Sequence, residues 1–288
     1  MSDISVLYDH PGPRARARNR ILTVCFAVVL AALLWFIYAR FNAKDQWAAA
    51  HWNPFLKSSV WKQFILPGLF QTLSAALVAM VLSLAFGLIF AVGRLSAHRW
   101  VSIPAGAAIE FCRAVPLLLL MFFLFFGMPF LTHKPFPAFW AVVIALTLYN
   151  GSVLAEAFRA GIRAVPRGQS EAAYAIGLRK HQLMRYILVP QATRAMLPVI
   201  VSQLVVLNKD TALGYIIAFP ELLQRGGNEL TANYGNVVAA AIVLAAIYIA
   251  INGAITIFAG WLDRRLAARG SRSTARAEAA VLDVATGG

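Results

Sequence analysis

Residues 168–177 read GQSEAAYAIG, a run of small side chains around one acid, Glu171, in a chain that is otherwise mostly apolar. The alanines favour a short helix with a low surface that a second protein can approach closely. Gly177 permits the left-handed backbone turn that commonly ends a helix. Two interpretations remain open from these residues: a solvated basic loop at a membrane surface, and a docking site for a partner protein.

The composition indicates a protein whose surface largely faces lipid. Of 288 residues, 60% are hydrophobic and 13% are charged, whereas a soluble domain has about 45–50% apolar and about 25% charged residues. The net charge of +14 comes from clusters between apolar runs. These clusters lack the basic and aromatic pattern of a nucleic-acid surface, so we exclude nucleic acid as a partner. Cys25 and Cys112 have no neighbours at metal-ligand spacing, and we expect no metal site.

Six apolar segments divide the chain, at about 21–41, 64–93, 104–130, 138–160, 192–219 and 236–261. Each can cross the lipid bilayer, because a helix of about 20 apolar residues spans its hydrocarbon core. Backbone polar groups in lipid need partners within the chain, and long apolar runs supply them as helices. We therefore predict an all-α membrane protein with about six transmembrane helices.

The distribution of Lys and Arg predicts the orientation of these helices. Eighteen of them lie on the side of both chain ends, and six lie on the opposite side. Because loops rich in Lys and Arg stay inside the cell, we expect both termini in the cytoplasm. The chain then consists of a cytoplasmic basic arm (1–20), a transmembrane domain (21–261) containing the cytoplasmic segment 161–190, and a basic tail (262–288) that we expect to be disordered.

The opening stretch belongs to a longer pattern. Glu171-Ala172-Ala173 is followed by three residues, Gly177, nine residues and then Ile187-Leu188-Val189-Pro190. This pattern resembles the cytoplasmic signature of bacterial ABC importer permeases, with Val189 where Leu is usual. In that family the segment is a coupling helix that fits a groove on an ATPase subunit. The resemblance implies a coupling role for Gly168, Glu171, Ala172, Ala173, Gly177 and Leu178.

The resemblance extends over nearly the whole chain. Residues 110–118, 155–162 and 209–213 are similar to the polar amino-acid permeases of the histidine/glutamine type. Residues 5–9 and 11–13 resemble the N-terminus of one permease of a glutamate uptake system. One departure is Arg179-Lys180, where the family usually has a Ser that could cap a second short helix. This departure leaves the start of that helix open.

The resemblance implies a type I ABC importer permease fold and a multi-pass location in the bacterial plasma membrane. The substrate would be a polar amino acid, with glutamate as the first choice. The implied partners are an ABC ATPase dimer that binds ATP and Mg, a second related permease in a heterodimer, and an external substrate-binding protein. The chain has no G-x-x-x-x-G-K-[ST] phosphate loop, so we expect it to be non-enzymatic and to hold no cofactor itself.

Two other classes of protein compete with this interpretation. An ion-coupled secondary amino-acid transporter often has Gly- or Pro-broken spans in matching positions of two halves, and no such pair is evident. A membrane scaffold would carry out no transport at all. Uptake that an ionophore abolishes would favour the first, and a complex that moves nothing with ATP would favour the second.

Charges inside apolar segments are costly, so they usually have a partner or a task. Glu110 and Arg113 are three residues apart, and we predict that they pair on one helix. Glu156 is predicted to pair with Arg159 or Arg163. These pairs could be purely structural and hold helices together.

Candidates for the substrate path come from the other polar residues of the spans. A zwitterion with a side-chain carboxylate needs cations and amide donors along its way. The candidates are Arg113, Tyr149, Asn150, Gln203, Asn208, Lys209 and Asp210. A structural pair of Lys209 with Asp210 remains an alternative, and the dipeptide 150–151 could mark a close helix contact.

Overall fold

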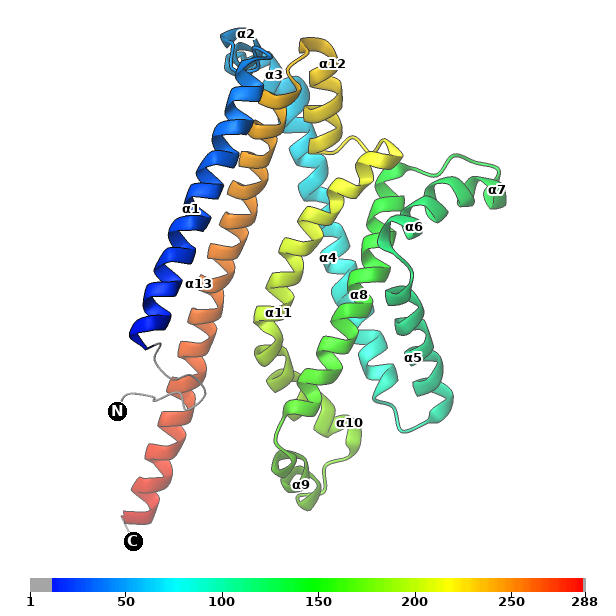
Figure 1. The fold of residues 1–288 in the computed structure, drawn as a ribbon. Coiled ribbons are helices and arrows are strands. Elements are labelled where there is room, and N and C mark those ends of the chain that lie inside the picture. The colour runs from blue at the N-terminus through cyan, green and yellow to red at the C-terminus, as the bar shows by residue number, and fades with distance from the viewer. Residues whose placement is uncertain (1–11, 287–288) are drawn as a thin grey trace. The chain divides into compact units, whose positions relative to one another are not determined.

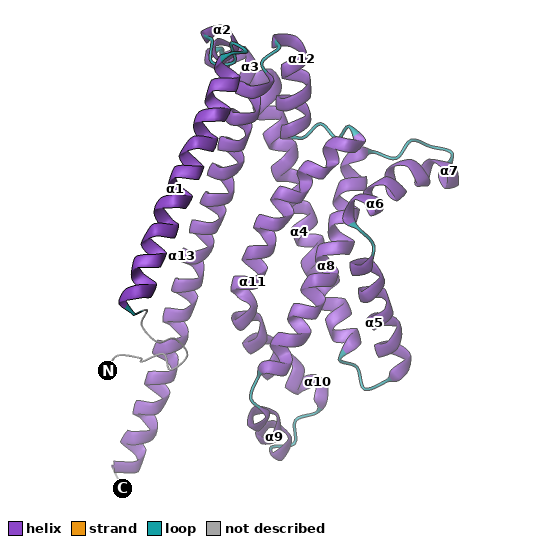
Figure 2. Cartoon of the chain, in the orientation of Figure 1, coloured by secondary structure: helices purple, strands orange, loops and turns teal. Residues whose placement is uncertain are grey.

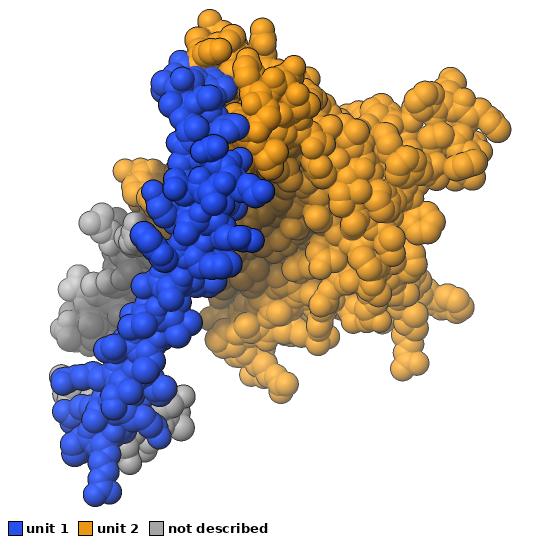
Figure 3. Space-filling model, turned by 45° about the horizontal axis from the view of Figure 1, so that its top comes forward, with its two compact units in different colours: residues 1–56 blue, residues 57–288 orange. Residues whose placement is uncertain are grey.

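The computed structural model describes residues 12–286, and the described chain consists of helices joined by short loops, without strands (Figures 1 and 2). It divides into two compact units, Met1–Leu56 and Lys57–Gly288 (Figure 3). The N-terminal resemblance at residues 5–9 and at residue 11 lies outside the described residues. Five helices are long and apolar enough to cross a membrane, or six if one bent pair counts as a span. The all-helical prediction is therefore confirmed for the described residues.

The first unit contains α1 (Pro13–Asn42), α2 (Ala49–Trp52) and a 3-10 turn, Asn53–Leu56. Proline suits the first turn of α1 because the missing N–H has no helical partner there. The predicted span 21–41 lies within α1, and the basic residues of the arm from position 14 onward continue the same helix. Beyond α1, Trp47 stacks between the rings of Tyr38 and Trp52, with centroid distances of 5.7 and 6.1 Å. Such rings are typical of a membrane–water interface.

Two long helices, α4 (Leu66–Arg94) and α8 (Ala138–Ala164), pack along each other at the centre of the second unit. Short turns before α4, α3 (Ser58–Val60) and a π-helical turn (Trp61–Ile65), extend its span to Ser58–Arg94. Glycines let the two backbones approach. A Cβ on Gly151 would lie 2.8 Å from Cδ1 of Phe86, and one on Gly87 would lie 2.9 Å from Cβ of Leu154. The close helix contact at position 151 is thus confirmed.

This contact gives a first prediction, on stability. Gly87→Ala should lower the free energy of unfolding by about 1 to 2 kcal/mol, because the new methyl group overpacks the interface between α4 and α8. The measurement is the thermal unfolding of the purified chain in detergent. Gly253→Ala is the matched control, since a Cβ there meets nothing within 4 Å. A Gly87→Ala protein as stable as this control would contradict the tight contact.

The third predicted span, 104–130, is not one straight helix. It forms α5 (Arg99–Ala114), α6 (Leu117–Phe122), a π-helical turn (Phe123–Gly127) and α7 (Met128–Thr132), with a bend of 97° between the two halves. The break lies at Val115 and Pro116. Proline has no N–H and drives the preceding residue out of the helical region, and Val115 has φ −78° and ψ 125°. The apolar composition of residues 104–130 predicted a single span, whereas in the structure the helix is broken at Pro116.

The remaining elements complete the unit. They are α9 (Arg167–Ala175), α10 (Lys180–Leu183), a π-helical turn (Met184–Leu188), α11 (Val189–Asp210), a 3-10 helix (Thr211–Ile217), a π-helical turn (Gln224–Glu229), α12 (Leu230–Tyr234) and α13 (Val237–Thr286). The main core lies between α4, α6, α8 and α11 and includes Ala79, Met121, Leu146 and Leu207. Residues 262–286 are assigned to the continuation of α13. Their Ala, Arg and Leu content favours helix.

Candidate functional site

The segment 161–190 forms two short helices beyond one end of the spans, as Figure 1 shows. The first, α9, begins after Pro166 and ends in a left-handed turn at Gly177, whose φ is +82°. The N–H of Gly177 donates to the carbonyl of Tyr174, and the N–H of Leu178 donates to the carbonyl of Ala173, both at 3.0 Å. These two bonds make a Schellman motif. The predicted helix end at Gly177 is confirmed.

The predicted coupling residues lie on both faces of α9. Glu171 and Ala172 are exposed, while Ala173 is only 1% exposed. Ala173 packs in a small apolar cluster with Ile162 of α8 and Leu183 of α10. One side of α9 therefore anchors the segment to the spans, and the other side is open. Gly168 and Gly177 leave empty space where a Cβ would be, which keeps the open surface low.

The second short helix, α10, begins without the serine that the family usually has. The N–H of Arg179 donates to Oε1 of Gln182 at 2.8 Å. The side chain of a glutamine three residues later thus accepts a backbone N–H that has no partner within the helix. Nζ of Lys180 donates to the carbonyl of Leu95, just past the end of α4, at 3.2 Å. The unusual Arg179-Lys180 pair thus starts the helix and also ties it to a span.

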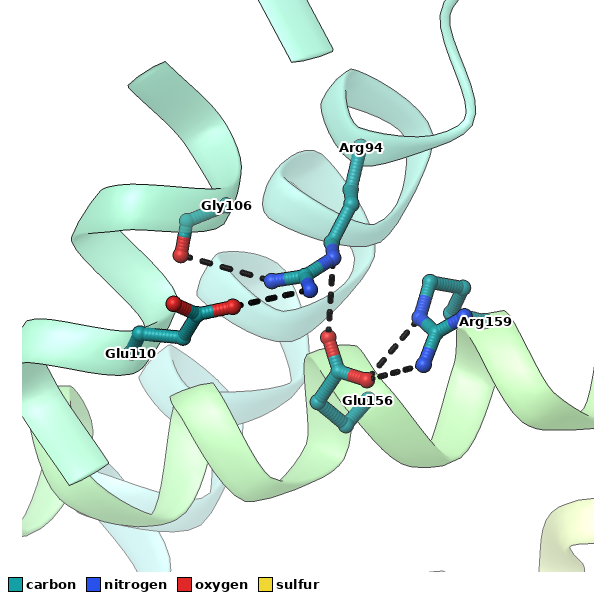
Figure 4. Close-up of polar contacts among 5 residues, drawn as sticks. All are labelled: Arg94, Gly106, Glu110, Glu156 and Arg159. Atoms are coloured by element: carbon teal, nitrogen blue, oxygen red, sulfur yellow. Dashed lines mark hydrogen bonds and ion pairs between the residues drawn. The ribbon is translucent and has the colours of Figure 1, made fainter. Parts of the chain in front are cut away.

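Arg94, the last residue of α4, joins three helices at this same end (Figure 4). Its Nη2 lies 3.0 Å from Oε1 of Glu110, and its Nε lies 3.3 Å from Oε1 of Glu156. Its Nη1 donates to the carbonyl of Gly106 at 3.3 Å. Glu156 is also paired with Arg159, whose Nη2 is 2.6 Å from Oε2. We call Arg94, Glu110, Glu156 and Arg159 the charge cluster.

The charge cluster corrects one predicted pair and confirms another. Glu110 pairs with Arg94 and not with Arg113, which is exposed one turn further along α5. The reason is that α4 and α5 pack together, which brings the guanidinium group of Arg94, at the end of α4, next to Glu110 on α5. The pair of Glu156 with Arg159 is present as predicted. Arg94 was missed because it resembled an ordinary basic residue at a span boundary.

Further along the spans, four amide side chains form a polar seam: Asn150, Gln203, Asn208 and Asn252. Nε2 of Gln203 on α11 donates to Oδ1 of Asn150 on α8 at 2.5 Å. Nδ2 of Asn208, also on α11, donates to Oδ1 of Asn252 on α13 at 3.2 Å. Asn150 and Asn208 are fully buried. The polar seam therefore links α11 to a helix on each side by side-chain hydrogen bonds.

A groove of about 710 Å³ runs beside the polar seam, between α11 and α13. Lys209 lines it together with Tyr248, Asn252 and Thr256, and the rest of its wall is apolar. Lys209 is exposed, and no salt bridge within 4 Å involves it among the described residues. A cation without an ion pair can take a carboxylate, whereas the hydroxyl groups of Tyr248 and Thr256 already donate to Glu221 and to the carbonyl of Asn252.

Not all candidates for the substrate path meet at this groove. Asn208 reaches it through its bond to Asn252, and Gln203 and Asn150 continue the polar seam. Arg113 and Tyr149 do not line it, and Asp210 is half-buried next to Lys209 in sequence. The structure thus groups Lys209 with Asn208 and separates Arg113 from them.

Sequence reasoning also missed a buried acid near the opposite end of the spans. Glu221 is fully buried and accepts the N–H groups of Leu223 and Gln224, both at 2.7 Å, and the hydroxyl of Tyr248 at 2.9 Å. Burial raises the pKa of this carboxyl, although the three hydrogen bonds act in the opposite direction. Thr72 accepts the N–H of Leu222 at 3.0 Å. Glu221 therefore fastens the loop after α11 to α13.

These features define a class of protein: a bundle of membrane-spanning helices that carries an anchored two-helix segment beyond one end and polar groups between its spans. The chain belongs to the family of binding-protein-dependent transport system inner membrane components, whose model matches residues 83–268. It is a multi-pass membrane permease of an ABC importer for amino acids. Permeases of this family work with an ATPase and a substrate-binding protein, and they are typically non-catalytic.

Three comparisons illustrate this membership. The chain is 40% identical to the glutamate transport system permease protein GluD of Corynebacterium glutamicum, over 80% of this chain and 85% of that protein. It is 35% identical to the probable glutamine ABC transporter permease protein GlnP of Bacillus subtilis, over 70% and 93% of the two chains. Its fold is similar to the crystal structure of an amino acid ABC transporter with histidines, with a TM-score of 0.65 and 30% identity, over 69% and 92%.

Proposed function

We propose that this chain carries glutamate through the membrane as one permease of a heterodimeric importer. The observation that supports glutamate as the substrate is the 40% identity to a glutamate transport permease over most of both chains. The exposed cation Lys209 in the groove between α11 and α13 supports an acidic substrate. An external binding protein would deliver the amino acid, and a second, related permease would complete the path.

In this proposal an ATPase dimer binds ATP and Mg and docks on the exposed side of α9. We expect that end of the spans to lie in the cytoplasm, because Lys and Arg are enriched in the loops there. Three contacts support a mechanical link from α9 to the spans: the apolar cluster around Ala173, the bond from Lys180 to Leu95, and the charge cluster beside it. Closure of the ATPase dimer would move this segment and rock the spans as rigid bodies.

The test is reconstitution of the complete importer, with its ATPase and binding protein, in vesicles. Labelled glutamate, aspartate, glutamine, histidine and arginine are supplied outside, and uptake is followed with and without ATP inside. We expect ATP-dependent uptake with glutamate preferred. An equal rate for all five amino acids would refute the glutamate assignment. Uptake that needs an ion gradient and ignores ATP would refute the importer and favour a secondary transporter.

Gly177 provides the prediction for the coupling segment. Gly177→Ala should lower ATP-driven uptake about fivefold while leaving the order of substrate preference unchanged, because a left-handed alanine costs about 1 kcal/mol and distorts the end of α9. The readouts are uptake and the stimulation of ATPase activity by the loaded binding protein. Gly235→Ala is the matched control, since Gly235 has a φ of +63° and equal free space but lies outside the segment. Equal losses in both variants would mean that Gly177 has only a structural role.

A further inference from the structure

A second groove, of about 750 Å³, lies where the end of α4 meets α10 and the π-helical turn that follows it. Its floor is apolar and includes Leu88 and Val92 of α4. Four basic residues lie on the opposite wall: Arg179, Lys180, His181 and Arg185. We call it the basic groove. The ABC importer assignment leaves this combination of an apolar floor and a basic rim unexplained.

The charge on the rim of the basic groove has one sign. All four basic side chains are exposed, and no acidic residue lines the groove in the described part of the chain. The ammonium group of Lys180 donates one bond to the carbonyl of Leu95 and has further N–H groups to give. The two guanidinium groups present planar sets of donors that match phosphate oxygens. The rim therefore complements a phosphate-bearing anion.

The floor of the basic groove lies deeper along the span than the rim. Leu88 is seven residues before Leu95, which is about 10 Å along a helix, and it belongs to the span Ser58–Arg94. Leu88 and Val92 are 40% and 48% exposed. A soluble protein at the membrane surface does not reach hydrocarbon at this depth, whereas a lipid chain attached to the anion does.

We propose that the basic groove binds an anionic phospholipid. The phosphate lies against Arg179 and Arg185, and an acyl chain follows Leu88 and Val92 into the bilayer. Basic pockets at the ends of transmembrane helices recognise lipid headgroups in this way. The lipid would contact α4 and α10 together and would brace the segment that carries α9. This binding site is separate from the amino-acid path and from transport itself.

The experiment is native mass spectrometry of the complete importer complex, titrated with phosphatidylglycerol or with phosphatidylcholine of the same chains. Arg179→Gln with Arg185→Gln removes two rim charges and leaves the bond from Lys180 to Leu95. Arg163→Gln with Arg167→Gln is the matched control, because both arginines are exposed in the same segment but do not line the groove. Val92→Trp fills the floor and keeps every charge. Each spectrum also reports whether the complex is assembled.

We expect phosphatidylglycerol to bind more tightly than phosphatidylcholine. Each lost charge should weaken binding about fivefold, so the rim variant should lose about twenty-five-fold. The control should bind as the unchanged complex does, and Val92→Trp should also bind less. Equal binding of the two lipids, or a rim variant that binds normally, would overturn the proposal. So would full displacement of the lipid by inorganic phosphate, which would indicate a free-anion site, or loss of the ATPase from the rim variant, which would indicate a protein contact.

Discussion

Replacing Arg94 with glutamine should lower the free energy of unfolding by about 2 kcal/mol, because Glu110 and Glu156 lose the cation that bridges them, although Glu156 keeps its pair with Arg159. The side chains of Arg94 and Glu156 are only 25% and 18% exposed, so solvent screens this pair less than a surface pair. The carbonyl of Gly106 would lose its donor as well. The measurement is the midpoint of thermal unfolding of the purified chain, and of the complex, in detergent.

Two further variants show whether the loss belongs to the charge cluster. Arg99→Gln removes the same charge from an exposed site at the start of α5 and should have almost no effect. Arg94→Gln combined with Glu156→Gln should be less damaging than the sum of the single changes, because the two side chains interact directly. Strictly additive losses would show that Arg94 and Glu156 are not coupled, and the bridge between α4 and α8 would be wrong.

The same substitution should reduce ATP-driven uptake more than it reduces assembly. Arg94 joins α4, α5 and α8 next to Leu95, the residue whose carbonyl receives the bond from Lys180. Motion of the segment 161–190 would thus be transmitted to α4, α5 and α8 through the adjacent contacts of Arg94 and Leu95. Normal uptake per assembled complex in the Arg94→Gln variant would assign the charge cluster to stability alone.

The helices could be predicted because the thickness of the bilayer sets the length of a spanning helix. Apolar runs of that length are visible in the sequence. Five of the six segments match helices to within a few residues, apart from the longer ends of α1 and α13. The third segment broke at Pro116, whose effect on Val115 was available in the sequence. Apolarity alone cannot distinguish a straight span from one bent by 97°. A proline in the middle of a long apolar run therefore predicts a break in the span.

The turn that ends α9 at Gly177 was predictable to the residue, whereas the contacts that anchor the segment 161–190 were not. The end of α9 at Gly177 follows from local backbone chemistry, which a short pattern contains. The partner of Glu110 depends on which helix packs beside α5, and no local spacing contains that information. Glu221 was missed for the same reason, because its burial arises from α4 and α13 closing around a loop. An acid directly after Pro220 was the available signal.

Lys209→Met should lower glutamate uptake by a factor of about ten or more, because the variant loses a charge-assisted bond to the substrate carboxylate worth about 1.5 to 3 kcal/mol. ATPase activity of the assembled complex without substrate should be unchanged, since Lys209 lies between α11 and α13, away from α9. Lys209→Arg keeps the charge and should retain most of the uptake. Lys62→Met makes the same side-chain change at an exposed position outside the groove and serves as the control.

The competing interpretation of Lys209 is a structural pair with Asp210, and the same variants separate the two. A structural role predicts that Lys209→Met lowers the unfolding midpoint and reduces the uptake of every amino acid alike. A substrate role predicts normal stability and a loss that is larger for glutamate and aspartate than for glutamine. The geometry favours the second outcome, because Lys209 is exposed toward the groove and no salt bridge within 4 Å joins it to Asp210. Unchanged uptake of all three substrates would remove Lys209 from the path and leave the polar seam as the remaining candidate.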